Sequence, residues 1–232
     1  MNILAIDTSS VNATCAVLCG GTLAGEFSIC NKKTHSQMIM PMIDDVLKKA
    51  SLEIEDIDVF APCIGPGSFT GLRIGIAAAK ALCQARGKKI VGISSLDALW
   101  QNVFATEKTV CPIMDARRGD VYNALYLDGK KITPDRAISI DSLLLELDGK
   151  KAVFVGDGVF VHKEKIIEKM GENAYFAPPM HTLSRASSVA YLAQKRCENN
   201  DFDDYHTILP IYIRTCQAER EYNERMKEFN NG

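Results

Sequence analysis

Two aspartates are the residues best placed to do chemistry in this chain, because each ends an apolar run and opens a short polar turn. Asp7 begins the segment DTSS, and Asp115 begins the segment DARRGD. Carboxylates at the ends of two facing hairpins can hold a divalent metal ion or its waters, and the backbone N–H groups of such turns can bind phosphate. The pattern favours a nucleotide cleft between two similar halves of the chain.

The residue types inside the two turns argue against a working phosphate site. Glycine lets a backbone approach phosphate closely, yet the first turn offers hydroxyl groups and the second has an arginine where glycine is expected. The segment GDG adds a third acidic candidate on the nucleotide side. Each aspartate could instead simply cap a turn. We interpret the set as a vestigial nucleotide cleft, formed by Asp7, Thr8, Ser9, Asp115, Arg117 and Asp157.

Other common catalytic and metal-binding patterns are missing from the sequence. The histidines form no H-x-x-x-H pair and the eight cysteines form no C-x-x-C pair, which are the usual signs of helical or ribbon metal sites. There is no G-x-S-x-G segment, and GPGSFTGLR lacks the Gly-Lys-Ser/Thr of a P-loop. The sequence therefore predicts neither a metal site nor a catalytic nucleophile.

Composition excludes several classes of protein. Hydrophobic residues make up 47% and charged residues 24% of the 232 positions, as in ordinary globular domains rather than disordered chains. The formal net charge of −2 argues against a broad basic surface for binding nucleic acid alone. The first residues carry no basic signal region, and no apolar stretch is long enough to cross a membrane. We expect a cytoplasmic protein with no membrane contact.

Hydrophobic periodicity predicts two α/β halves of similar plan, each opening with a strand that ends in an aspartate. In the first half we expect strands at 2–7, 13–19, 22–30, 56–65 and 88–95, and helices at 35–50, 70–86 and 96–105. In the second half we expect strands within 109–132 and at 151–159, helices at 141–150 and 184–199, an extended piece at 206–214 and a charged helical tail.

The helix at 70–86 is unusual because small or apolar residues occur on nearly every side of it. A helix of this kind is expected to be buried all round, and small residues let a second backbone approach closely. We therefore predict that it forms a subunit interface. The predicted interface residues on this helix are Leu72, Gly75, Ile76, Ala79, Leu82 and Cys83.

Five segments, spread in order over residues 2–214, resemble the bacterial TsaB (YeaZ) family of tRNA threonylcarbamoyladenosine biosynthesis proteins. They are ILAIDTSS, HSQMIMPMIDDVL, GPGSFTGLRIGIAAAKAL, MDARRGDVY and PIYIR. The resemblance implies an α/β ASKHA (actin-like) fold with two lobes, each a mixed β-sheet flanked by helices. On this basis we expect an N-terminal lobe at 1–104, a C-terminal lobe at 105–206 and an extended segment with a charged tail at 207–232.

The resemblance also implies a role without catalysis. TsaD, the catalytic relative, carries a metal on a pair of histidines in a helix that corresponds to SSLDALWQNVF here, which contains no histidine. The family pairs with a TsaD-like subunit, or with itself, through its N-terminal helices, and works with a TsaE-like ATPase. The resemblance therefore implies that the helices at 35–50 and 70–86 form the interface together, which adds Met38, Met42, Ile43 and Val46 to the predicted interface residues. Together they modify the adenosine 3′ of the anticodon in tRNA. No cofactor is expected to be required, ATP or ADP in the cleft stays open, and contact with tRNA is expected to be indirect.

Two other classes of function stay open at this stage. An active ASKHA-type ATPase or kinase needs a phosphate site, against which Arg117 counts. A metallopeptidase needs metal ligands, against which the missing histidine pair counts.

Overall fold

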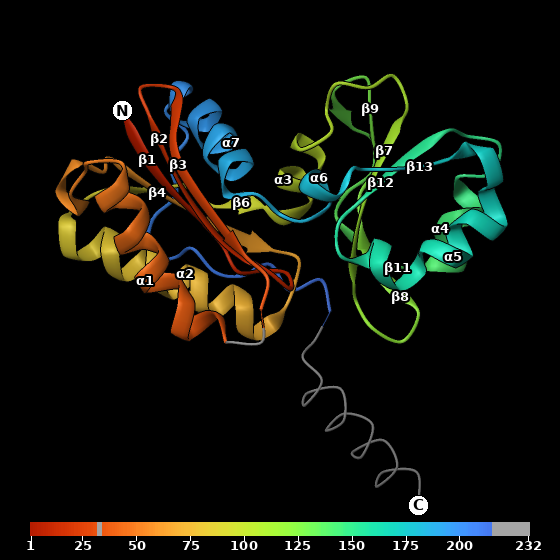
Figure 1. Cartoon of the computed structure of the whole chain (residues 1–232), viewed down its shortest axis with the longest axis horizontal. Coiled ribbons are helices and arrows are strands. Elements are labelled where there is room, and N and C mark those ends of the chain that lie inside the picture. Colours follow the sequence, from red (N-terminus) through yellow and green to blue (C-terminus); the bar gives the residue numbers. More distant parts are fainter. Residues whose placement is uncertain (32–33, 215–232) are drawn as a thin grey trace, which may run out of the picture.

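Two β-sheets lie side by side and are covered by helices (Figure 1), in a computed structural model that describes residues 1–31 and 34–214. The first sheet has the order β3–β2–β1–β4–β5, with β6 pairing with the end of β4. β1, β2 and β3 form an antiparallel meander, and β4 and β5 continue the sheet in parallel with β1. In chain order these strands span Asn2–Asp7, Ala13–Cys19, Thr22–Ile29, Val59–Gly65, Lys89–Ile90 and Ile93–Ser94.

The second sheet repeats this plan around β7. β8 is antiparallel to both of its neighbours, β7 and β11, while β12 and β13 follow in parallel with β7. A short hairpin of β9 and β10 adds to the other end of β7. The strands β7 to β13 span Thr109–Asp115, Asp120–Asn123, Tyr126–Leu127, Lys130–Lys131, Arg136–Ser139, Ala152–Val155 and Ala174–Phe176. The expected duplication of α/β halves is confirmed in this strand order.

Helices cover both faces of the sheets, which is why the central strands are almost continuous apolar runs. The helices α1 to α7 span His35–Lys49, Phe69–Arg86, Ser95–Gln101, Ile140–Glu146, Gly158–Met170, Pro179–Thr182 and Ala186–Glu198. Two short 3₁₀ turns lie at Ile54–Asp56 and Gly171–Asn173. Among the described helices, none is both long and apolar enough to cross a membrane.

The sequence predicts a glycine-rich loop after the strand at 151–159, and the helix α5 is not among the expected elements. Gly158 instead begins the helix, with Asp157 at its N-cap. The expected charged helical tail lies outside the described residues. The extended piece expected at 206–214 contains no regular strand and crosses from one lobe to the other, as described below.

Side chains along β1 point alternately to the two faces of the first sheet, and helices cover both of these faces. Leu4 and Ile6 pack with α1 and α2, whereas Ile3 and Ala5 pack with α7. The predicted lobe boundaries are therefore wrong at the C-terminal end, because α7 lies within the expected 105–206 lobe yet completes the first one (Figure 1). The apolar second face of β1 requires cover, and the chain returns from the second lobe to supply it.

The helix α2 is not buried on all sides within this chain. Leu72, Ile76 and Cys83 face the sheet, but Ala77 and Ala81 on the opposite side are exposed. A single sheet can bury only one stripe of a helix. The outward stripe of α2 therefore stays uncovered in the monomer.

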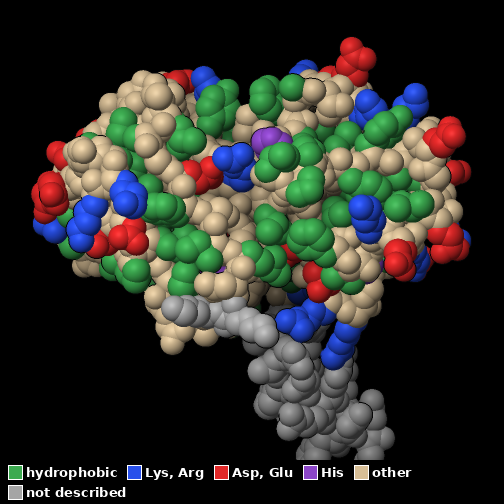
Figure 2. Space-filling view, viewed as in Figure 1, with side chains coloured by type: hydrophobic (Ala, Val, Ile, Leu, Met, Phe, Trp, Pro, Cys, Tyr) green, Lys and Arg blue, Asp and Glu red, His purple; other side chains and the backbone are tan. Residues whose placement is uncertain are grey.

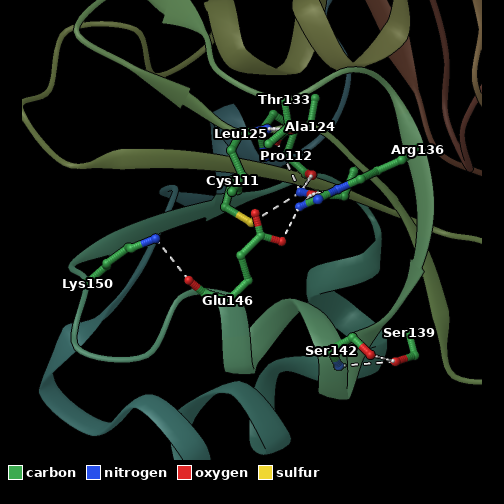
Figure 3. Close-up of polar contacts among 11 residues, drawn as sticks. Cys111, Pro112, Ala124, Leu125, Thr133, Arg136, Ser139, Ser142, Glu146 and Lys150 are labelled. Atoms are coloured by element: carbon green, nitrogen blue, oxygen red, sulfur yellow. Dashed lines mark hydrogen bonds and ion pairs between the residues drawn. The ribbon is translucent and has the colours of Figure 1, made fainter.

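In the second lobe, Asn123 of β8 joins β7 and β11 through polar contacts, and Arg136 of β11 extends these contacts to α4. Its side-chain amide donates to the carbonyl oxygens of Pro112 (2.9 Å) and Ala124 (3.1 Å), and its Oδ1 accepts from the Arg136 guanidinium (3.2 Å). Arg136 and Glu146 point toward each other in Figure 3, and their charged groups lie 2.6 Å apart. The partner of β7 changes from β9 to β8 in this region, and Asn123 satisfies the carbonyl groups beside the change.

We expect Asn123→Ala to lower the free energy of unfolding by about 1–3 kcal/mol, because buried polar groups lose their partners. Urea denaturation followed by circular dichroism measures the change. Lys150→Ala is the control, since Lys150 is exposed and bonds only the Glu146 carbonyl in the same region; surface changes of this kind cost within about 0.5 kcal/mol. A loss at Asn123 no larger than the loss at Lys150 would contradict the structural role assigned to this network.

Candidate functional site

The turns that end β1 and β7 meet across a cleft between the lobes, with a volume of about 710 Å³. Ser9, Asp115, Arg117 and Asp157 line it, so the structure brings these four predicted residues together. The other walls come from the start of α2, the exposed residues at the start of α5, and residues 211–214.

Asp7 and Thr8 lie behind this cleft rather than on its surface. Asp7 is 1% exposed, and its Oδ1 accepts the N–H of Ser9 at 2.7 Å, which is the turn-capping alternative left open by the sequence. The Thr8 hydroxyl donates to the carbonyl of Gly71 at 2.7 Å and so faces α2. Both side chains hold the turn in place against the helix.

The glycines of GPGSFTGLRIG allow α2 to lie directly on the turn after β1. A Cβ atom at Gly71 would be 2.0 Å from the Thr8 carbonyl oxygen, and one at Gly67 would be 2.4 Å from the Ser9 carbonyl oxygen. The N–H of Ser68, the N-cap of α2, donates to that same Ser9 oxygen at 2.7 Å. The prediction of a close backbone approach holds at Gly71, but the neighbour is the chain's own turn.

Asp157 contacts the turns of both lobes at once. Its Oδ2 accepts the hydroxyl of Ser10 at 2.8 Å, and its Oδ1 accepts the N–H of Asp115 at 3.2 Å. Burial raises the pKa of Asp157, while the hydrogen bonds from Ser10 and from the Asp115 N–H act in the opposite direction. Ser10 is held in turn from the first lobe, because His35 Nε2 donates to its carbonyl at 2.9 Å.

The second turn contains two arginines, of which Arg117 lines the cleft. Arg117 and Arg118 have φ angles of 63° and 57°, the left-handed region that costs residues other than glycine about 1–2 kcal/mol each. The N–H of Arg117 donates to Asp115 Oδ1 at 2.8 Å, and both side chains are exposed. The arginine at the expected glycine position therefore adopts a glycine-like conformation.

Residues 211–214 form a strap that the sequence did not predict, crossing the cleft mouth from the first lobe to the second. The N–H of Ile211 donates to the Ile64 carbonyl at 2.7 Å, and Tyr212 stacks on Phe69 with ring centroids 4.7 Å apart. At the far end, Arg214 donates to the Ala116 carbonyl at 2.9 Å and pairs with Asp120. The apolar run of PIYIR gave no sign of this path, because its contacts join distant parts of the chain.

Within residues 1–31 and 34–214, no group of three His, Cys, Asp or Glu side chains is arranged to hold a metal ion. The amides of the two turns are also engaged. Ser9 N–H donates to Asp7, Arg117 N–H donates to Asp115, and Asp115 N–H donates to Asp157. In a phosphate-binding hairpin such groups face the ligand, whereas here they face carboxylates of the chain itself.

The interface predicted from the sequence requires correction. Ala79 and Cys83 are 0% exposed, and Gly75 lies against the Thr8 hydroxyl. A partner cannot reach side chains that fill the chain's own core, because the apolar stripe of each helix already packs against the sheet. Met38 and Leu82 are half-buried. The predicted interface residues that are buried within the monomer are Met42, Ile43, Val46, Leu72, Gly75, Ile76, Ala79 and Cys83.

Two lobes that repeat one strand order on either side of a cleft define an ASKHA (actin-like) protein, and solved structures of similar fold confirm the expected fold class. YeaZ from Pseudomonas aeruginosa has a TM-score of 0.75 and 24% identity, covering 91% of this chain and 99% of that one. Component A of (R)-2-hydroxyglutaryl-CoA dehydratase from Acidaminococcus fermentans has a TM-score of 0.52 and 13% identity, covering 85% and 99%.

Sequence comparisons show to which family within this fold class the chain belongs. A family model described as TsaD, tRNA N6-adenosine threonylcarbamoyltransferase, matches residues 29–222. The tRNA threonylcarbamoyladenosine biosynthesis protein TsaB of Bacillus subtilis is 31% identical over 98% of this chain and 100% of its own length. The chain belongs to the TsaB (YeaZ) family, which is related to TsaD.

We expect Gly71→Ala to destabilise the protein by about 1–3 kcal/mol, although alanine is ordinarily the better helix former, because overpacking against fixed backbone costs more than the propensity gain. Gly87→Ala is the control, since its Cβ meets nothing within 4 Å and only its φ of 60° opposes the change. Urea unfolding measures both variants. A Gly71 variant as stable as the wild type would show that α2 does not rest on the Thr8 carbonyl.

Proposed function

We propose that this chain is a non-catalytic subunit of the machinery that forms threonylcarbamoyladenosine in tRNA, at the adenosine 3′ of the anticodon. It binds a TsaD-like catalytic subunit through the outward face of α1 and α2. The observation that carries the pathway is the identity with a TsaB protein along almost the whole chain. The rest of the proposal is supported by the geometry of the helices and of the cleft.

The outward face of α1 and α2 suits another helix pair. Ala77 and Ala81 are exposed one turn apart on α2, and Met40 is 45% exposed beside Pro41 on α1. Alanines allow close approach of helices, and methionine adapts to irregular surfaces. This outward face, made by Met40, Pro41, Ala77 and Ala81, replaces the mostly buried set predicted from the sequence.

A role without catalysis is supported by the cleft. A metallopeptidase needs metal ligands that the described residues do not group together, and the helix α3 contains no histidine. A kinase or ATPase needs free donors for phosphate, while three turn amides here donate to Asp7, Asp115 and Asp157. These contacts favour a binding subunit over the two enzymatic alternatives.

The same outward face of α1 and α2 is the starting point for the other proposed partners. A second copy of this chain offers an identical helix pair, so homodimer and heterodimer compete for one surface. A TsaE-like ATPase joins the assembled pair, and tRNA contacts the catalytic subunit rather than this chain. Intermingled Lys, Arg, Asp and Glu side chains on the face shown in Figure 2 support an indirect contact with tRNA, because nucleic-acid surfaces gather positive charge.

We expect Ala77→Glu to abolish binding of the TsaD-like subunit without unfolding the chain, because it places an unpaired charge in the centre of an apolar contact. The loss amounts to about 2–5 kcal/mol, or roughly 30-fold to 4,000-fold in affinity. Light scattering after size exclusion measures the complex, and circular dichroism checks the fold. Ala105→Glu, at an exposed alanine away from both helices, is the control.

The same variants test the pathway when threonylcarbamoyladenosine is measured by mass spectrometry in a reconstituted reaction. Ala77→Glu is expected to lower the product to the level found without the chain, and Ala105→Glu to leave it unchanged. If Ala77→Glu pairs and modifies tRNA normally, the outward face of α1 and α2 is not the interface.

A further inference from the structure

One carboxylate occupies the point at which the turns of the two lobes meet. Asp157 accepts hydrogen bonds from Ser10 of the first lobe and from the Asp115 amide of the second. Both donors lie in the turns where an ASKHA-type cleft would present groups to an anionic ligand. Asp157 is therefore placed where an anion between the two lobes would be bound.

We propose that the Asp157 carboxylate is a built-in anion that locks the two lobes together and excludes phosphate-bearing ligands from the cleft of this chain. The proposal goes beyond the role in tRNA modification, because it assigns a positioning residue and a ligand preference to a cleft to which that role gives no task. Its direct consequence is that removing the carboxylate creates a slot for a small external carboxylate.

The surroundings of Asp157 make this slot selective. The Ser10 hydroxyl and the Asp115 N–H converge on two oxygen atoms of one carboxylate, 2.8 Å and 3.2 Å away. The carboxylates of Asp115 and Asp7 are held by neighbouring turn amides. A single small anion can replace the Asp157 group, whereas a polyphosphate chain meets further negative charge and amides that already donate elsewhere.

The lock also reaches the helix that carries part of the proposed partner face. His35, the first residue of α1, donates to the Ser10 carbonyl at 2.9 Å, and Ser10 donates its hydroxyl to Asp157. The hydrogen bonds thus run from the start of α1 through the turn after β1 to the second lobe. Losing Asp157 is expected to loosen the turns at 7–10 and 115–120 first.

The test is chemical rescue in the full-length protein. Asp157→Ala keeps Cβ and removes the carboxylate group that formate reproduces. We expect the variant to melt about 2–4 °C below the wild type, as modest losses do in proteins of this size, and formate at constant ionic strength to restore the melting temperature. Hydrogen exchange of the turns at 7–10 and 115–120 is expected to rise in the variant and to fall again with formate.

The controls separate the lock from general effects of charge and salt. Asp157→Asn fills the slot and is expected to show no response to formate. Asp141→Ala removes an exposed carboxylate paired with Lys165 on the surface of the same lobe, and is expected to show neither the loss nor the rescue. ADP with magnesium is expected to leave the melting temperature of the wild type unchanged.

Three results would overturn the proposal: equal stability of Asp157→Ala and wild type, equal responses of both to formate, or a melting-temperature rise in the wild type with ADP and magnesium. If Asp157→Ala does not fold, Ser10→Ala provides the decisive reading, because it removes one of the two donors. Its turn at 115–120 must then exchange faster than in the wild type, and unchanged exchange would overturn the lock. None of these readings depends on binding of a TsaD-like subunit.

Discussion

The contact between the start of α2 and the turn after β1 fixes the orientation of much of the first lobe. Backbone lies almost directly on backbone there, since even one added carbon at Gly71 would meet the Thr8 carbonyl oxygen at 2.0 Å. Such contacts tolerate very little adjustment, because the opposing atom belongs to the main chain. They set which stripe of α2 faces the sheet, and so which stripe faces outward.

From this constraint follows the division of the two helices into a core face and an outward face, and the outward face is the one that we propose for docking. The apolar residues at sheet-facing positions, such as Ile43 and Ile76, belong to the core. Ala77 and Ala81 lie on the opposite side and are exposed. The sequence indicates that α2 has more apolar surface than one contact can bury. It does not show which stripe of the helix faces the sheet and which stripe faces outward. That separation depends on the rotation of the helix about its axis, which the turn at Thr8 determines.

Other features were predictable to the extent that they are local. The alternation and turn signals predict the bounds of β1, β2, β3 and α1 closely. The return of α7 to the first lobe and the path of the strap were not predictable, because both depend on contacts between residues that lie far apart in the sequence. Val189 of α7 packs in one cluster with Ile3, and Arg214 of the strap bonds Ala116, 98 residues away. The sequence singles out the three aspartates, but it does not show that Asp115 and Asp157 line the cleft while Asp7 lies behind it. The choice between binding a ligand and capping a turn depends on the hydrogen-bond partners of their oxygens.

The hydrogen-bond partners of these aspartates also distinguish the cleft from one that binds phosphate. In an ASKHA plan the turns of the two lobes present amides across a gap, and here Asp7, Asp115 and Asp157 accept those amides. The fold is kept while three turn amides that could face phosphate donate instead to carboxylates of the chain itself. These contacts are the basis on which we propose that the chain contributes surface and rigidity, and that a partner contributes the chemistry.

The most direct measurement of that claim is the amount of threonylcarbamoyladenosine formed by a TsaD-like subunit, a TsaE-like ATPase and threonylcarbamoyl-adenylate synthase. The reaction contains threonine, bicarbonate, ATP and unmodified tRNA, and is run without this chain, with it, and with its Asp115→Ala, Arg117→Ala double variant. The account predicts no product without the chain and full product with either form. Equal product in its absence, or loss of product in the folded double variant, would contradict a non-catalytic subunit that acts through its helices.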